Sequence, residues 1–276
     1  MKKIGITILF SVLIIGCSSF QEKVPPVSSV QVYNAILIDD TYLLNKYLSE
    51  NPNLTEEQFN VLLLRSLENN SLKSIKTLLD RGANVNYVDE KTGKTPIFFV
   101  RSINALNILI GEGAYINIET SDKESLLSYF IKNKNPKYSQ LLIEKGANLS
   151  SWDILLAAVL SGNPLLIQNM ISHGANFSQT DKFGNYPIYY AYSENILKIL
   201  LQINSYNLNQ VNKKNENVLG EVYLRAVANS YIDVVNEILK LGVNPYYMSY
   251  GDNALIIAKN SNNKDMLKFL QSKGLN

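Results

Sequence analysis

Runs of leucine and isoleucine at helical spacing alternate with short turns rich in glycine and asparagine along most of this 276-residue chain. In the clearest example, Leu72 to Asp80 place apolar side chains on one helical face with lysines between them, and Gly82 follows. Glycine can adopt the left-handed backbone conformation that ends a helix. The pattern therefore predicts a series of short amphipathic helices separated by turns.

The turns recur at a nearly constant spacing. Their glycines are Gly82, Gly113, Gly146, Gly174, Gly242 and Gly274. The steps between successive glycines are 31, 33, 28, 68 and 32 residues, so the long step holds two units, the first ending near Asn204. A degenerate first copy lies at Asn51–Leu54. A period of about 33 residues is typical of a stacked array, because the apolar face of one unit is too small to form a core alone.

Each unit is predicted to hold two antiparallel helices and a projecting turn. Asp181–Asn185 is turn material, and Pro187 follows it at the first position of a helix, where its missing N–H costs nothing. The same order occurs at Thr95 and Pro96, where we expect the threonine hydroxyl to cap the first helix.

These residues resemble the ankyrin repeat. Its consensus contains Gly-x-Thr-Pro-Leu-His and Leu-Leu-x-x-Gly-Ala-x-x-Asn, and the strongest matches here are Lys94–Ile97 and Leu78–Asn86. The resemblance covers Val32 to Asn276 and implies an all-α ankyrin-repeat solenoid of about eight helix-turn-helix units, some of them degenerate. In that family the histidine bonds to neighbouring turns. Phe98 and Tyr189 stand at the matching positions, so we expect aromatic packing to replace that network.

Two irregularities in the spacing predict local changes. Ser150 and Ser151 lead directly into Trp152, which leaves almost no projecting turn in that unit. Near Val218 to Leu224 the alignment leaves about four extra residues, which we expect to lie before the first helix of the unit.

The first residues predict export and a lipid anchor. Lys2 and Lys3 precede an apolar run from Ile4 to Ile15 that is short for a membrane span, as in a secretion signal. Gly16 and Cys17 follow, which resembles a bacterial lipobox whose cysteine is lipidated. The alternative is a plain signal peptide with an incidental cysteine.

The predicted organisation is a lipoprotein signal peptide at 1–16, a lipidated N-terminus and tether at 17–29, and an ankyrin-repeat domain at 30–276. Ser18 after the lipidated position resembles an outer-membrane sorting signal in didermal bacteria. We therefore expect a lipid anchor in the outer membrane, on its periplasmic or surface face, in a didermal source. In any other source we expect the anchor on the outer face of the plasma membrane.

Charge gives no support for nucleic-acid binding. The chain has 26 Lys and Arg against 24 Asp and Glu, and Lys2 and Lys3 leave with the signal, so the mature balance is 24 against 24. Short basic clusters such as Lys213-Lys214 are interpreted as solvated turns. We expect neither a nucleic acid nor a small-molecule substrate as partner.

No arrangement of residues predicts catalysis, a metal or a cofactor. Cys17 is the one cysteine and His173 the one histidine, so a nucleophile with an adjacent base is not evident. His173 stands at the predicted end of a second helix, where packing explains it. Asp39 and Asp40 are interpreted as helix initiators rather than cation ligands.

The residues most available for recognition lie in the projecting turns and on the solvent side of the first helices, because the helix residues between repeats are committed to stacking. Tyrosine supplies a large rigid surface with a polar tip, and the chain has 17 Tyr against 9 Phe. The predicted partner-binding residues are Tyr87, Lys91, Lys94, Phe183 and Tyr250.

The sequence thus predicts a non-enzymatic, membrane-anchored lipoprotein that binds a protein partner in the bacterial cell envelope or at the cell surface. The alternative is an accessory or protective protein that shields or localises an exported enzyme or toxin.

Overall fold

A computed structural model describes residues 30–276 except 91 and 204–205, so Cys17, Lys91 and Asn204 lie outside the described residues. The described chain is built from short helices and forms two compact units, the first ending at Ala114 and the second running from Tyr115 to Asn276. Among the described residues, no helix is both long enough and apolar enough to cross a membrane.

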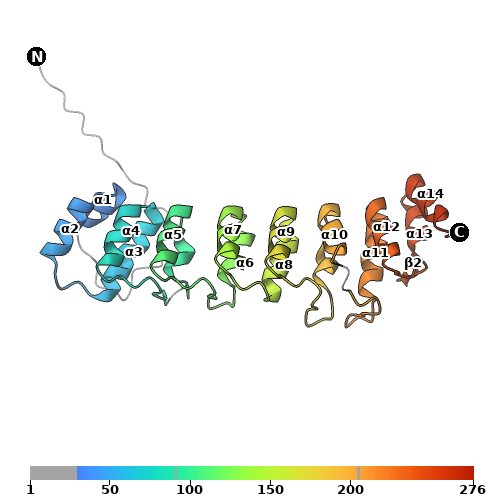
Figure 1. Cartoon of the computed structure of the whole chain (residues 1–276), viewed down its shortest axis with the longest axis horizontal. Coiled ribbons are helices and arrows are strands. Elements are labelled where there is room, and N and C mark those ends of the chain that lie inside the picture. Colours follow the sequence, from blue (N-terminus) through green and yellow to red (C-terminus); the bar gives the residue numbers. More distant parts are fainter. Residues whose placement is uncertain (1–29, 91, 204–205) are drawn as a thin grey trace, which may run out of the picture. The chain divides into compact units, whose positions relative to one another are not determined.

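The first unit contains three helix pairs. Their members are α1 (Val30–Leu37) with α2 (Thr41–Glu50), α3 (Glu56–Asn69) with α4 (Leu72–Asp80), and the 3₁₀ turn η1 (Pro96–Phe99) with α5 (Ile103–Gly111). Figure 1 shows the two helices of a pair lying side by side, as α3 and α4 do. Asp40 caps α2 by accepting from the N–H groups of Tyr42 and Leu43, which confirms its role as a helix initiator.

The second unit contains five pairs. They are α6 (Leu126–Lys132) with α7 (Pro136–Glu144), α8 (Trp152–Ser161) with α9 (Pro164–Ser172), η2 (Pro187–Tyr190) with α10 (Glu194–Leu201), α11 (Val218–Ala228) with α12 (Ile232–Lys240), and α13 (Ala254–Asn260) with α14 (Lys264–Ser272). A small hairpin of β1 (Met248–Ser249) and β2 (Asp252–Asn253) precedes α13, with Met248 opposite Asn253. The described residues therefore hold the eight helix pairs that the period predicts, and the all-α prediction is confirmed.

The core of each unit lies between the helices. In the first unit Leu62, Leu67 and Leu78 have no exposed surface. Hydrogen bonds also join neighbouring helix pairs. The Asp39 carboxylate, between α1 and α2, accepts from the backbone N–H of Ser74 in the first turn of α4 at 2.8 Å. Each pair thus buries an apolar face that it could not bury alone.

Two first helices are shorter than predicted. Pro96 and Pro187 do start helical segments, but η1 and η2 are single 3₁₀ turns, because the caps of the second helices, Ser102 and Ser193, follow almost at once. The predicted Thr95 cap is also wrong. Thr95 stands at the N-cap position, yet its hydroxyl is buried without a hydrogen-bond partner in the described structure.

The two spacing irregularities have different outcomes. Helix α8 begins at Trp152 directly after Ser151, as the short turn predicts. The expected insertion before the first helix at Val218 is wrong, because α11 itself begins at Val218 and runs for 11 residues. The extra residues lengthen the helix, which buries them instead of leaving them in a loop.

Candidate functional site

Three successive turns of the second unit project beyond the helices, on the same side of the unit in Figure 1. We call them finger 1 (181–185), finger 2 (212–216) and finger 3 (248–253). Side chains of their own stabilise fingers 1 and 2, the β1–β2 pairing closes finger 3, and hydrogen bonds join each finger to the next.

Asp181 organises finger 1. Its carboxylate accepts from the backbone N–H groups of Phe183 at 2.7 Å and Asn185 at 2.9 Å, and from the hydroxyl of Tyr190 at 2.5 Å. Burial raises the pKa of Tyr190, and its bond to Asp181 adds to that effect. These bonds fix the turn so that the side chain of Phe183 is left at the surface.

Backbone and amide contacts hold finger 2 against finger 1. The Lys213 N–H donates to the Phe183 carbonyl at 2.8 Å, and the Asn212 side-chain amide donates to the Asn185 side-chain oxygen at 3.1 Å. Gly184 has φ of +87°, and a Cβ there would lie 3.0 Å from the Val211 carbonyl oxygen. Glycine is required because the two backbones approach closely at a left-handed position.

Glu216 connects finger 2 to finger 3 and to η2. Its carboxylate accepts from the Asn212 side chain at 2.8 Å, the Tyr250 hydroxyl at 2.7 Å and the Tyr189 hydroxyl at 3.3 Å. The bond from Asn212, followed by that from Tyr250, lowers the pKa of Glu216. Burial, with the neighbouring Glu216, raises the pKa of Tyr189 to about 12.

These bonds change one prediction. Tyr189 at the family's histidine position was expected to replace the turn-to-turn network by aromatic packing, but its hydroxyl reaches Glu216 of the next finger. A third bond of this kind joins Tyr247, before finger 3, to Glu221 of α11 at 2.8 Å. The turns are therefore connected by tyrosine hydroxyls and carboxylates.

Behind the fingers, the first helices present an aromatic surface. The ring of Trp152 in α8 lies edge-on to that of Tyr190, with centroids 6.2 Å apart. The guanidinium of Arg225 in α11 lies 4.8 Å from the ring centroid of Tyr192 and 5.7 Å from that of Tyr189. Burial lowers the pKa of Arg225, and the ring faces compensate part of its lost hydration.

In comparison with known proteins, the chain is similar in sequence to proteins named as ankyrin repeat proteins. No protein-family model matches the chain. It is 33% identical over 114 residues to a protein of Acanthamoeba polyphaga mimivirus named as an ankyrin repeat protein, which covers 39% of this chain and 64% of that protein. A second protein of that virus with the same designation is 24% identical over 227 residues, covering 75% of this chain and 53% of its own length. A fowlpox virus ankyrin repeat protein is 26% identical over 134 residues, or 47% of this chain and 20% of that protein. The chain thus spans 64% or less of the length of these curated relatives.

A solved structure decides the fold. The ankyrin repeat domain of Bcl-3, a member of the IkappaB protein family, superposes with a TM-score of 0.63 and 18% sequence identity, over 76% of this chain and 99% of that domain. The chain has the ankyrin-repeat fold. In ankyrin terms, fingers 1 to 3 are the projecting turns, and the aromatic surface lies on the first helices of the repeats.

The structure places the predicted binding residues in two separate groups. Phe183 and Tyr250 lie on fingers 1 and 3 of the second unit, with 47% and 87% of their surface exposed. Tyr87 and Lys94 lie at one turn of the first unit and are half-buried. Burial, with the nearby carboxylate of Asp89, raises the pKa of Tyr87.

Sequence reasoning missed Trp152, Tyr190, Tyr192 and Arg225. The prediction ranked the turns above the first helices, although Pro187–Tyr190 followed by Tyr192 is a visible aromatic cluster. Only the short η2 turn, with Arg225 donating to the Ile188 carbonyl at 3.4 Å, shows why these side chains meet.

The remaining candidates have structural explanations. His173 lies at the end of α9, where its Nδ1 is 2.8 Å from the Asn169 carbonyl oxygen, as expected for a helix-end residue. Within the described residues, no three His, Cys, Asp or Glu side chains are grouped to hold a metal ion.

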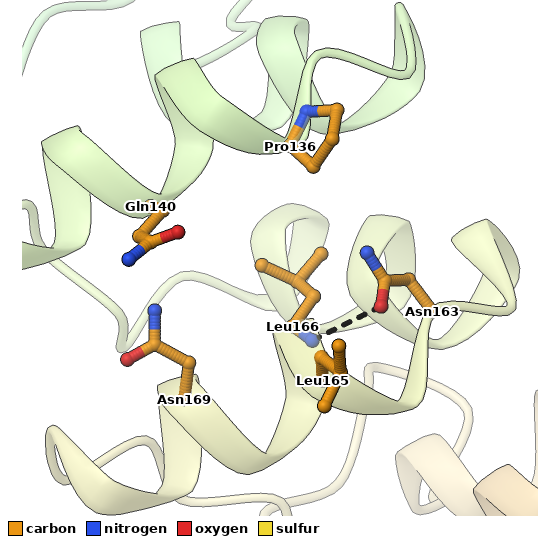
Figure 2. Close-up of a pocket in the computed structure, with 6 residues that line it drawn as sticks. All are labelled: Pro136, Gln140, Asn163, Leu165, Leu166 and Asn169. Carbon is orange, nitrogen blue, oxygen red and sulfur yellow. Dashed lines mark hydrogen bonds between the residues drawn. The ribbon is translucent and has the colours of Figure 1, made fainter.

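Figure 2 shows a pocket of about 280 Å³ between α7 and α9, on the second helices. Its lining consists of Pro136, Gln140, Asn163, Leu165, Leu166 and Asn169. Asn163 caps α9 through the Leu166 N–H, drawn as the dashed line in Figure 2. The lining has amide and apolar groups but no charged one, so nothing in it points to chemistry on a ligand.

Proposed function

We propose that this chain is a lipid-anchored ankyrin-repeat protein that binds a protein partner in the bacterial cell envelope or at the cell surface. The observation that carries the proposal is the exposure of Phe183 and Tyr250 on fingers fixed by hydrogen bonds. The aromatic surface at Trp152 and Tyr192 extends the same recognition region onto the first helices.

Physical reasons favour a protein as the partner. Aromatic side chains contribute much of the binding energy at protein interfaces, and a surface that is ordered before binding loses little entropy on association. Fingers 1 to 3 satisfy both conditions, since Asp181 and Glu216 hold them in place. A protein suits this extended surface better than a small molecule or a nucleic acid.

The membrane part of the proposal comes from the sequence. Cys17 follows an apolar run and Gly16, and a lipidated cysteine would hold the array at a membrane. In a didermal source we place the anchor in the outer membrane, and otherwise on the outer face of the plasma membrane. The proposal contains no catalytic step, and the polar cluster around Glu216 is used to join the fingers.

Crosslinking of the full chain in envelope preparations, followed by mass spectrometry, tests the proposal. We expect a specific protein to be captured, and the combined Tyr87→Ala, Phe183→Ala and Tyr250→Ala variant to lose it. Loss of an aromatic anchor costs ~2 kcal/mol or more at an interface. Circular dichroism should remain that of the wild type.

Two control variants separate binding from folding. Tyr250→Phe keeps the ring and removes only the bond to Glu216, so it should retain capture. The second control combines Leu37→Ala, Tyr42→Ala and Leu165→Ala, which remove large exposed side chains that are not part of the fingers. Equal capture by the aromatic triple variant and the wild type would place recognition elsewhere on the chain.

A further inference from the structure

Fingers 1 and 2 together present three exposed lysines, two of which lie near one aromatic ring. We call Lys182, Phe183, Lys213 and Lys214 the basic tip. The ammonium groups of Lys182 and Lys213 lie 5.1 Å and 5.8 Å from the centroid of the Phe183 ring. All three lysines are exposed, and in the part of the chain that the structure describes none of them forms an ion pair.

The carboxylates of these fingers accept hydrogen bonds from groups other than the lysines. Asp181 accepts two backbone N–H groups and the Tyr190 hydroxyl, and Glu216 accepts from Asn212 and two tyrosine hydroxyls. Glu216 is only 8% exposed. Both carboxylates are therefore occupied by hydrogen-bond donors, while the three lysines remain exposed. Lys214 lies near enough to Glu216 to help the bond from Asn212 lower the pKa of that carboxyl.

The spacing of the lysines is set by the backbone. The Lys213 N–H donates to the Phe183 carbonyl at 2.8 Å, and the Gln210 side chain donates to the Gly184 carbonyl at 3.0 Å. The Lys214 N–H donates to the Asn212 side chain at 2.9 Å. A ligand that meets these lysines has little backbone to order, which lowers the entropic cost of binding.

We infer that the basic tip binds an acidic segment of the partner protein, with carboxylates on the lysines and an apolar side chain against Phe183. This inference rests on the proposed function and specifies the chemistry of its partner. A protein segment is favoured over a nucleic acid, because three lysines on two fingers neutralise few phosphates, whereas specific nucleic-acid binders make roughly 6–10 phosphate contacts. The exposed Phe183 ring adds an apolar contact that a polyanion would not use.

The test uses the full chain in detergent and a dye-labelled peptide of sequence Gly-Glu-Glu-Leu-Glu-Glu-Gly, with fluorescence anisotropy at low ionic strength. We expect saturable binding that weakens with salt, and none with the peptide that has glutamine in place of glutamate. Combined Lys182→Ala, Lys213→Ala and Lys214→Ala should weaken binding about tenfold, because three exposed charge pairs with the peptide are lost. Phe183→Ala alone should weaken it on the order of fivefold.

A charge-matched control is available in the last repeat. Combined Lys264→Ala, Lys268→Ala and Lys273→Ala removes three exposed positive charges away from the tip and should leave binding within about twofold of the wild type. Equal losses in the two triple variants would overturn the inference, since net charge alone would then explain binding. Tighter binding to anionic vesicles or single-stranded RNA than to the peptide would overturn it as well.

Failure of this inference is distinguishable from failure of the proposed function. A captured partner that binds the wild type and the Lys182, Lys213 and Lys214 variant equally well would refute the acidic segment and leave protein binding intact. Peptide binding at the basic tip without any captured partner would support the preference for acidic segments and count against the proposed function.

Discussion

One carboxylate, that of Glu216, joins parts of three consecutive repeats in the second unit. It accepts from Tyr189 of η2, from Asn212 of its own finger and from Tyr250 of finger 3. These donors favour the charged form and lower its pKa. Stability linked to Glu216 is therefore fully present above the ordinary carboxyl pKa of about 4.3 and is lost as the pH falls through the lower pKa of the folded protein.

Glu216→Gln tests that connection. The amide keeps an acceptor but loses the charge, so we expect a lower free energy of unfolding at pH 7 by about 1 kcal/mol, the difference between a charged and a neutral acceptor. The difference from the wild type should be smaller in acid, because the wild-type carboxylate is protonated as the pH falls through the lowered pKa of Glu216. Urea unfolding followed by circular dichroism at pH 7 and in acid measures it. Glu119→Gln, at an exposed position, is the control; a pH-independent difference would contradict the linkage.

The close approach of fingers 1 and 2 at Gly184 gives a second prediction. Gly184→Ala places a Cβ 3.0 Å from the Val211 carbonyl oxygen at φ of +87°. We expect a loss of stability of more than ~1 kcal/mol and weaker binding at the basic tip. Gly251→Ala has a similar φ of +89° but no atom within 4 Å of the added Cβ. The difference in thermal midpoint between the two variants measures the effect of the contact with the Val211 carbonyl oxygen. Equal midpoints would show that only the left-handed backbone conformation matters.

At the scale of the element, the repeats differ mainly in their first helices. η1 and η2 are single turns, while α11 has 11 residues. Of the eight second helices, α2 has ten residues, α10 has eight, and the other six have nine: α4, α5, α7, α9, α12 and α14. The six second helices of nine residues carry the regular apolar spacing and end at the glycine turns. Variation in the first helices changes the surface near the fingers without disturbing the stack.

Helix α8 provides a prediction about stacking. Ala158 has no exposed surface, which confirms the expected register, and Leu160 two residues later is 60% exposed. Ala158→Asp buries an unpaired charge and should cost several kcal/mol, whereas Leu160→Asp should cost almost nothing. Urea unfolding of the two variants measures the contrast. An unchanged midpoint for Ala158→Asp would show that the repeat tolerates separation at this interface.

The sequence was sufficient for the parts of the fold that depend on local pattern. The glycine turns and the eight repeats follow from the spacing. The surface positions of Phe183 and Tyr250 follow from their place in the turns. The bond from Tyr189 to Glu216 spans 27 residues and depends on the lengths of two turns, so no local pattern shows it. The cluster of Arg225 with Tyr192 likewise requires the short η2 turn, which the proline alone does not predict.

At the scale of the whole molecule, stability and location have separate origins. Each repeat is stabilised by its neighbours, so unfolding can begin in one of the two compact units while the other stays folded. Location is predicted from the first residues, where Lys2, Lys3 and the apolar run before Cys17 are typical of an exported lipoprotein. Two acyl chains make a lasting anchor, because burial contributes ~0.8 kcal/mol for each methylene.

Cys17→Ser tests the anchor directly. In the proposed lipoprotein pathway the thiol would be the acceptor of the lipid and lipidation would precede signal cleavage, so we expect the variant to carry no acyl label and to stay at precursor size. Metabolic labelling with a palmitate analogue and separation of membrane from soluble fractions measure both effects. Ser18→Ala, which keeps the thiol, should label like the wild type. Equal labelling of Cys17→Ser and the wild type would refute the lipoprotein part of the proposal, while partner capture by the ankyrin repeats would still be decided by Phe183 and Tyr250.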